Sequence, residues 1–199
     1  MVIAGIDGGM IRLGLAAVEI NDSDLDLFLY ELIETPRGEE SYNQFLSNGI
    51  TRITNIFPRF LDQTKPDLIV SETIPVGKLG SSDSQVVAAV TTCHVLAIQF
   101  GIPWRNIAAN TAKKLFTDDG RANKTLVRNT ALDMFPEVAE KHAQEKEVQK
   151  REGLKKRPGL AQDYFDAIAI AVAGSMQYRT YLTEFNDNQT KAMQAMQKA

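Results

Sequence analysis

Short apolar runs and longer helical patterns divide this chain into two parts. Near the N-terminus, three apolar runs follow one another closely, at Val2–Ile6, Ile11–Ile20 and Leu25–Ile33. Turn residues bound them: Asp7-Gly8-Gly9 follows the first run, and the polar stretch Asn21–Asp24 separates the second from the third. The pattern predicts three consecutive strands, with a hairpin turn at Asn21–Asp24, which together form an antiparallel meander.

Beyond this point the apolar residues recur at helical spacing. The first such stretch lies between Glu39 and Thr64, where Pro58 should kink the helix or end it early. The charge run Glu137–Arg157 is interpreted as either a solvated helix or a mobile loop. The remaining predicted elements are, in order, a strand at Asp67–Glu72, a helix at Ser84–Phe100, a strand at Trp104–Ala108, a short helix at Thr111–Phe116, and helices at Asn123–Phe135 and Ala161–Met176.

This order of elements predicts an α/β fold with a five-stranded mixed sheet, three strands antiparallel and then two parallel, flanked by helices. A helical crossover from the third strand most readily places the fourth strand parallel to the first. Asp7 and Glu72 would then lie at the same end of neighbouring strands. Ligands of α/β sheets bind outside the carboxyl ends of the strands, so this edge is where a site is expected.

The composition fits one domain with a sizeable core. Among 199 residues, 44% are hydrophobic and 24% charged, as in globular proteins rather than disordered ones. No apolar run could span a bilayer, and no signal sequence is recognisable, so we expect a cytoplasmic protein without membrane contact. Cys93 is the single cysteine, and His94 and His142 are the two histidines, too few for a zinc site. Cys93 and His94 are interpreted as core residues.

Two acids near the C-terminus extend the site expected at the sheet edge. Asp163 and Asp166 are spaced i, i+3 and share one helix face, and the small residues after them would let that helix lie close to the sheet. Taken singly, Asp7 could be a turn residue, Glu72 an exposed strand end, and the two later aspartates a cap and a first-turn acid. Their joint placement favours one metal-binding acidic site.

Carboxylates gathered in this way repel one another unless cations neutralise them. Oxygen-only ligands favour Mg²⁺, with Mn²⁺ as a substitute, over zinc. Two such ions about 4 Å apart activate a water and stabilise the leaving oxygen in phosphodiester cleavage. The acid set therefore predicts two ions in a site for phosphoryl chemistry.

Basic residues gather in two places although the net charge is −3. Phosphate contacts need local positive charge rather than a basic chain, but a solvated surface explains charge runs equally well. Trp104 could stack on a base, although a buried strand aromatic is the favoured interpretation. The candidate phosphate-contacting residues are Lys113, Lys114, Arg121 and Lys124 near the fifth strand, Lys155, Lys156 and Arg157 before Asp163, and the weaker candidate Lys78.

Four motifs in order resemble those of the RuvC-type Holliday junction resolvases, within the RNase H-like superfamily. The resemblance covers most of residues 1–176. Its most specific parts are the spacing of the basic segment and the closing motif with two aspartates. The matching residues are Gly5-Ile6-Asp7-Gly8-Gly9 with Gly14, the strand Leu68–Glu72, the set Lys113, Gly120, Ala122, Lys124 and Val127, and the segment Gln162–Ala171.

The resemblance implies an RNase H-like nuclease domain over 1–181, with a charged insertion at 137–160 and a polar tail at 182–199. It implies a homodimer that cuts opposing strands of branched DNA with Mg²⁺. Asp7, Glu72, Asp163 and Asp166 would be metal ligands and catalytic residues, and Lys124, with Lys113 as a second candidate, would contact the scissile phosphate. The helix Ser84–Phe100 is the candidate dimer interface.

Departures from the family pattern leave the DNA substrate open. Gly8 replaces a proline, Pro75 stands where an aromatic wedge is usual, Asp118 replaces a glycine, and the helix after Glu72 lacks internal glycines. They predict a divergent member, with a viral source as one interpretation, acting in a bacterial or host-cell cytoplasm. The alternatives are a nuclease for flaps, forks or RNA–DNA hybrids, and a junction-binding protein without catalytic activity.

Overall fold

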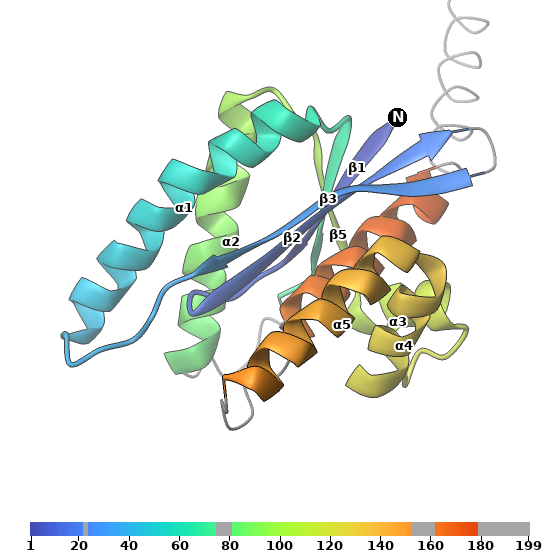
Figure 1. Ribbon diagram of the computed structural model, residues 1–199. Coiled ribbons are helices and arrows are strands. Elements are labelled where there is room, and N and C mark those ends of the chain that lie inside the picture. Colours follow the sequence, from blue (N-terminus) through green and yellow to red (C-terminus); the bar gives the residue numbers. More distant parts are fainter. Residues whose placement is uncertain (22–23, 75–80, 153–161, 179–199) are drawn as a thin grey trace, which may run out of the picture.

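A five-stranded mixed sheet with strand order β3-β2-β1-β4-β5 forms the centre of the protein (Figure 1). The computed structural model describes residues 1–21, 24–74, 81–152 and 162–178. β1 pairs antiparallel with β2 and parallel with β4, β2 pairs antiparallel with β3, and β4 pairs parallel with β5. The predicted mixed sheet is therefore confirmed. The strands are β1 (Val2–Asp7), β2 (Arg12–Asn21), β3 (Asp24–Glu34), β4 (Leu68–Glu72) and β5 (Trp104–Ile107).

Helices cover both faces of this sheet (Figure 1). They are α1 (Tyr42–Thr64), α2 (Ser81–Gln99), α3 (Ala109–Thr117), α4 (Lys124–Met134), α5 (Pro136–Arg151) and the helix of residues 162–178, called here the closing helix. Among the described residues, no helix is both long and apolar enough to cross a membrane.

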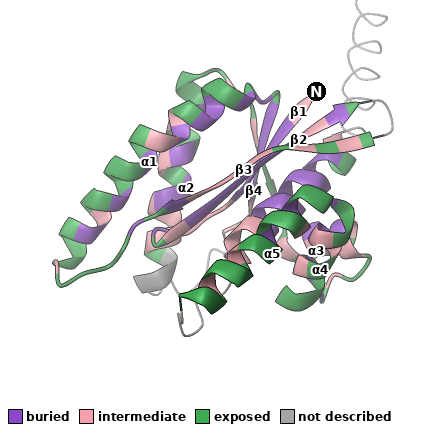
Figure 2. Ribbon diagram, viewed as in Figure 1, coloured by how far each residue is buried: buried purple, intermediate pink, exposed green. Residues whose placement is uncertain are grey.

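Alternation along each strand divides the hydrophobic core into two layers. In β1, Ile3 packs into the layer beneath the closing helix, whereas Ala4 and Ile6 pack into the layer beneath α1 and α2. Figure 2 shows the central strands and the inward helix faces buried, and the outward faces of α1 and α5 exposed. Because Asp7 follows Ile6, it points toward the closing-helix face of the sheet.

The helix α1 continues past Pro58 to Thr64, so the expectation that the proline ends it early is wrong. A proline inside a helix costs about 3 kcal/mol. Phe57, Phe60 and Leu61 are almost completely buried around it, and each such side chain contributes roughly 1.5–3 kcal/mol. Packing of this face on the sheet therefore outweighs the lost hydrogen bond.

Two further expectations concern α2 and the charge run. Cys93 is buried as predicted, but His94 is exposed and stacks on Trp104, with ring centroids 4.8 Å apart. The core assignment of His94 is wrong because it lies on the outward face of α2. Trp104 itself is half-buried, and its Nε1 donates to Ser71 Oγ at 3.2 Å. The part of the charge run that the structure describes forms a solvated helix, Pro136–Arg151, and residues 153–157 of the run lie outside the described residues.

Candidate active site

Asp7 and Glu72 reach the same corner of the sheet because β1 and β4 are parallel and in register. Ile6 pairs with Ser71, so the next residue on each strand is one of the two acids. The Thr73 N–H donates to the Ile107 carbonyl at 2.8 Å, which ties the end of β4 to β5. Both carboxylates therefore project from the carboxyl ends of strands, on the face that the closing helix covers.

Two glycines allow the closing helix to lie directly on the backbone of β1 and β2. A Cβ at Gly5 would collide with the Ala167 carbonyl, and a Cβ at Gly14 would collide with the Asp163 carbonyl. Gly14 is also the register partner of Asp7. The missing side chain at Gly14 thus brings the first turn of the closing helix over the end of β1, where Asp7 lies.

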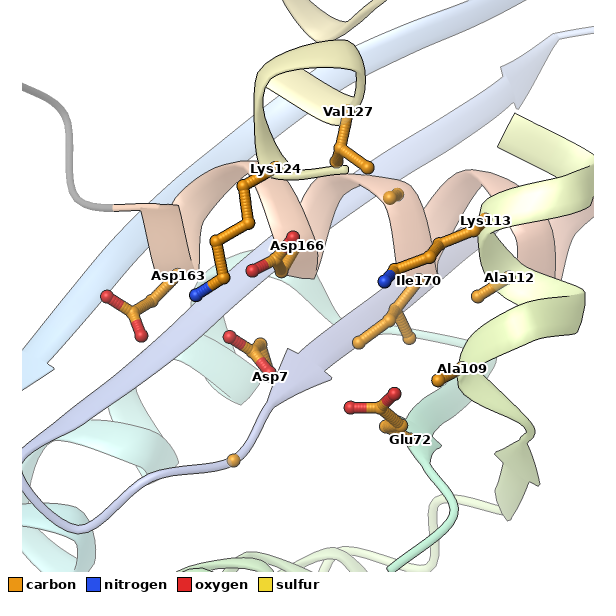
Figure 3. Close-up of a pocket in the computed structure, with 12 residues that line it drawn as sticks. Asp7, Glu72, Ala109, Ala112, Lys113, Lys124, Val127, Asp163, Asp166 and Ile170 are labelled. Atoms are coloured by element: carbon orange, nitrogen blue, oxygen red, sulfur yellow. The ribbon is translucent and has the colours of Figure 1, made fainter. Parts of the chain in front are cut away.

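Four carboxylates and two lysines consequently surround one cavity of about 350 Å³. Figure 3 shows Asp7, Glu72, Asp163 and Asp166 around a shared space, with the ammonium groups of Lys113 and Lys124 beside them. The apolar wall includes residues that the sequence did not single out as site residues: Ala109, Ala112, Val127, Ala169 and Ile170. The i, i+3, i+4 spacing of one helix face relates Ala109, Ala112 and Lys113. Given Lys113 as a candidate, this spacing could have identified the two alanines as neighbours in the site.

The charges of this cavity disfavour four ionised acids. Burial raises the pKa of Asp7 well above its usual value, with further increases from Asp166, Asp163 and Glu72, and Lys124 opposes them. Burial likewise raises the pKa of Glu72 and of Asp166. In the absence of a cation these groups therefore hold protons to higher pH than free carboxyls do.

Gln162 is a polar neighbour to which the sequence analysis gave no role. Its Nε2 donates to Asp166 Oδ1 at 3.1 Å, across one helical turn. The i, i+4 spacing of a glutamine and an aspartate is the signal that could have identified it. Because its hydrogen bond lowers the pKa of Asp166, Gln162 favours the ionised form that a metal ligand needs.

The donor chemistry of the cavity fits a divalent cation. All four candidate ligands are hard carboxylate oxygens, which suit Mg²⁺ or Mn²⁺. Burial, with neighbouring acids as a further cause, raises the pKa of Asp7, Glu72 and Asp166. Within the described part of the chain, no three acidic, cysteine or histidine groups are already arranged to hold one ion. Binding would therefore require these side chains to rotate toward a common point.

The predicted basic residues separate into three sets. Lys113 and Lys124 line the acidic cavity. Lys114 and Arg121 are exposed and line a different, open hollow of about 870 Å³ beside α3. Lys78, Lys155, Lys156 and Arg157 lie outside the described residues, as does Pro75.

Gly8, which departs from the proline of the family pattern, has a local explanation. A Cβ at this position would collide with Cγ2 of Val90 on α2. Val90 is itself buried, and a β-branched side chain is stiff. The absence of a side chain at position 8 lets the loop after Asp7 pack against α2.

A sequence model of the family described as crossover junction endodeoxyribonuclease RuvC matches residues 3–174. The chain belongs to the RuvC family. This confirms the predicted enzyme class, an endonuclease that cleaves DNA junctions. No curated protein matches the sequence.

Solved structures of RuvC proteins share the fold. The structure of Thermus thermophilus RuvC is 22% identical and has a TM-score of 0.63, covering 90% of this chain and 96% of its own. The same protein in complex with a Holliday junction substrate has a TM-score of 0.65 at 22% identity, with the same coverage. The yeast mitochondrial Holliday junction resolvase is 13% identical with a TM-score of 0.53, covering 92% of this chain and 85% of its own.

Proposed function

We propose that this protein cuts four-way or other branched DNA by metal-dependent hydrolysis in the cavity between β1, β4 and the closing helix. The observation that carries the proposal is the convergence of four acids from three distant segments, with two lysines on the same cavity. The Thermus thermophilus RuvC that shares the fold binds a Holliday junction substrate. We propose that it acts in the cytoplasm of a bacterium or, for a viral genome, of the host cell.

The acids have distinct roles because their positions in the cavity differ. The charges of all three other acids raise the pKa of Asp7, so Asp7 would be the ligand shared by two ions. Glu72 and Asp166 would each hold one ion, and Asp163 would complete the set. Two Mg²⁺ ions, or Mn²⁺ in their place, supply an activated water and stabilise the leaving oxygen when bound.

The lysines act on the phosphate rather than on the water. Lys124 begins α4 and Lys113 lies on α3, and both ammonium groups project toward the acids (Figure 3). A cation placed where charge develops stabilises the transition state without reorganisation. Lys124 is therefore assigned to the scissile phosphate and Lys113 to the same or an adjacent phosphate.

Further phosphates of the DNA would lie along the surface next to the cavity. Lys114 and Arg121 line the neighbouring hollow, where they suit backbone contacts that position the duplex without reading its sequence. Lys78, Lys155, Lys156 and Arg157 are proposed for the same role from their place in the sequence. All of these contacts would weaken as salt rises.

A homodimer would place two such cavities on one junction, because a two-fold axis supplies two equivalent sites. The candidate interface is the α2 stripe, defined as Thr91, His94, Val95 and Ile98, which lie on one face of the helix and are exposed. Val95 is 51% exposed and Ile98 65% exposed. The opposite face of α2 packs Ala89, Cys93 and Ala97 into the core, so the stripe faces outward, where a second copy would pack.

The decisive experiment compares Asp7→Asn with wild type on four-way junction, fork, flap, duplex and RNA–DNA hybrid substrates, with Mg²⁺ and with Mn²⁺. Asp7→Asn should abolish cleavage and leave junction binding intact, because it removes one ligand charge and little volume. Asp62→Asn is the matched control, since Asp62 is exposed on α1 at the opposite face. Wild-type rates from Asp7→Asn would refute the assigned site.

The substrate panel also separates the alternative functions. Faster cleavage of a flap or hybrid than of a junction would indicate the broader nuclease. Junction binding without any metal-dependent product over hours would indicate a binding protein whose acids are structural. The complete set of four acids in one cavity favours catalysis over that last alternative.

A further inference from the structure

The two residues between Asp163 and Asp166 are both aromatic, and both point away from the cavity. Phe165 is completely buried, and Tyr164 packs against the same core layer. Successive residues of a helix project about 100° apart, so the two aspartates and the two aromatic rings lie on different faces of the same turn. Any force that moves the rings therefore also moves the carboxylates.

Each of these rings meets one ring from another element, edge to face. Tyr164 meets Tyr30 of β3, with centroids 5.5 Å apart and planes at 86°. Phe165 meets His142 of α5, with centroids 5.7 Å apart and planes at 80°. Edge-to-face pairs have a preferred geometry and hold rings in place more specifically than aliphatic packing does.

The helix α5 takes part in both contacts through consecutive residues. His142 touches Phe165 directly, and Lys141 places its ammonium nitrogen 4.5 Å from the centroid of the Tyr30 ring. Figure 1 shows α5 running alongside the closing helix, on the side away from the sheet. The first turn of the closing helix is thus held between Gly14 below, where the Asp163 carbonyl lies, and α5 above.

The chemistry of His142 indicates that its ring shape is what this position uses. The side chain is 5% exposed, and neither ring nitrogen has a hydrogen-bond partner among the described residues. Burial, followed by the charges of Lys146 and Arg128, lowers its pKa, so the ring is uncharged at neutral pH. An uncharged imidazole without hydrogen bonds to the described residues contributes here through the packing of its aromatic ring.

We propose that α5 is a positioning brace, in which His142 and Lys141 act through Phe165, Tyr30 and Tyr164 to fix Asp163 and Asp166 for metal binding. The inference rests on the proposed nuclease function. It gives a role to the helix α5 in the charge run, which the sequence alone left as either a solvated helix or a mobile loop. The residues that form the brace do not line the acidic cavity, so the proposal makes them positioning residues and not catalytic ones.

The test uses the full chain with His142→Ala, His142→Phe and the matched control Gln144→Ala, whose side chain is exposed on the same helix. The measurements are the Mn²⁺ affinity by electron paramagnetic resonance, the Mg²⁺ concentration for half-maximal junction cleavage, and the thermal unfolding midpoint. Residues that orient metal ligands typically change affinity or activity about 10–100-fold when mutated. His142→Ala should weaken both metal measurements within that range, whereas His142→Phe and Gln144→Ala should match wild type.

Several outcomes would overturn the brace. One is an unchanged metal affinity in His142→Ala. Another is a loss of metal affinity in His142→Phe as large as in His142→Ala, which would indicate that the imidazole chemistry matters instead of the ring packing. If His142→Ala does not fold, Tyr30→Leu and Tyr30→Phe test the other contact, with the leucine expected to weaken metal affinity and the phenylalanine to preserve it. Equal affinity in those two variants would then refute the brace.

Failure of the proposed function gives a different result. If wild type cleaves no branched substrate under conditions in which it binds Mn²⁺, the nuclease assignment fails while the affinity comparison still decides the brace. If wild type cleaves junctions and the His142 variants do not differ from it, the brace alone fails.

Discussion

Replacing Gly14 with alanine tests the claim that close backbone packing builds the acidic site. A methyl group at this position would lie 2.7 Å from the Asp163 carbonyl carbon, and closer still to its oxygen, whereas ordinary contacts begin at 3.4 Å. The closing helix must therefore retreat by at least about 0.7 Å, taking Asp163 and Asp166 with it. Both colliding groups are backbone, so no side-chain rotation relieves the contact.

The expected effect is larger on catalysis than on folding. Overpacking of this kind costs about 1–3 kcal/mol of unfolding free energy. A misplacement of about 1 Å costs roughly 100-fold in rate, so the retreat should lower the single-turnover rate tens- to a hundredfold. The stability is measured by denaturant unfolding, and the rate by junction cleavage at saturating Mg²⁺ well below the unfolding midpoint.

The matched control for this variant is Gly38→Ala. A methyl group there would meet only the flexible carboxylate end of Glu40, so both stability and rate should stay close to wild type. The reasoning fails if Gly14→Ala keeps the wild-type cleavage rate, because the acids would then tolerate displacement of the helix that carries them.

Two further predictions follow from the charges and the exposed surfaces. Because burial and neighbouring acids raise the pKa of Asp7 above its usual 3.8, the charge of Asp7 destabilises the metal-free fold as pH rises through and above that value. Asp7→Asn should therefore unfold at a higher temperature than wild type at pH 7 without metal, and this difference should shrink toward pH 3.8. An equal unfolding midpoint at pH 7 would contradict the electrostatic account. Ile98→Glu in the α2 stripe should convert the proposed dimer to a monomer by light scattering, whereas Ile50→Glu, at an exposed position on α1, should not; a wild-type monomer both free and on DNA would reject the dimer.

Local patterns in the sequence predict much of the fold. Apolar alternation and the turn residues predict the meander of β1, β2 and β3. The helical crossover then predicts β4 parallel to β1, because right-handed connections of this kind leave few arrangements. Helical spacing puts Asp163 and Asp166 on one face, and the small residues after them indicate a helix that packs closely.

Other features depended on contacts between distant segments. Pro58 remains inside α1 because Phe57, Phe60 and Leu61 pack on the sheet. Local helix propensity takes no account of this packing. His94 lies on an apolar helix, yet its side of that helix faces outward. Lys113 and Lys114 are neighbours in sequence, but only Lys113 reaches the acidic cavity, since adjacent helical residues point in different directions.

By itself, the sequence determined the sheet, the parallel pairing of β1 with β4, and the identity of the four acids as one set. These follow from periodicity and spacing, which are local properties of the chain. Only the tertiary structure decided how closely the closing helix approaches the sheet, which bases share the cavity, and that α5 packs through His142 onto Phe165. Those features are set by shape complementarity between segments far apart in sequence, where a single absent Cβ at Gly14 determines where two carboxylates lie.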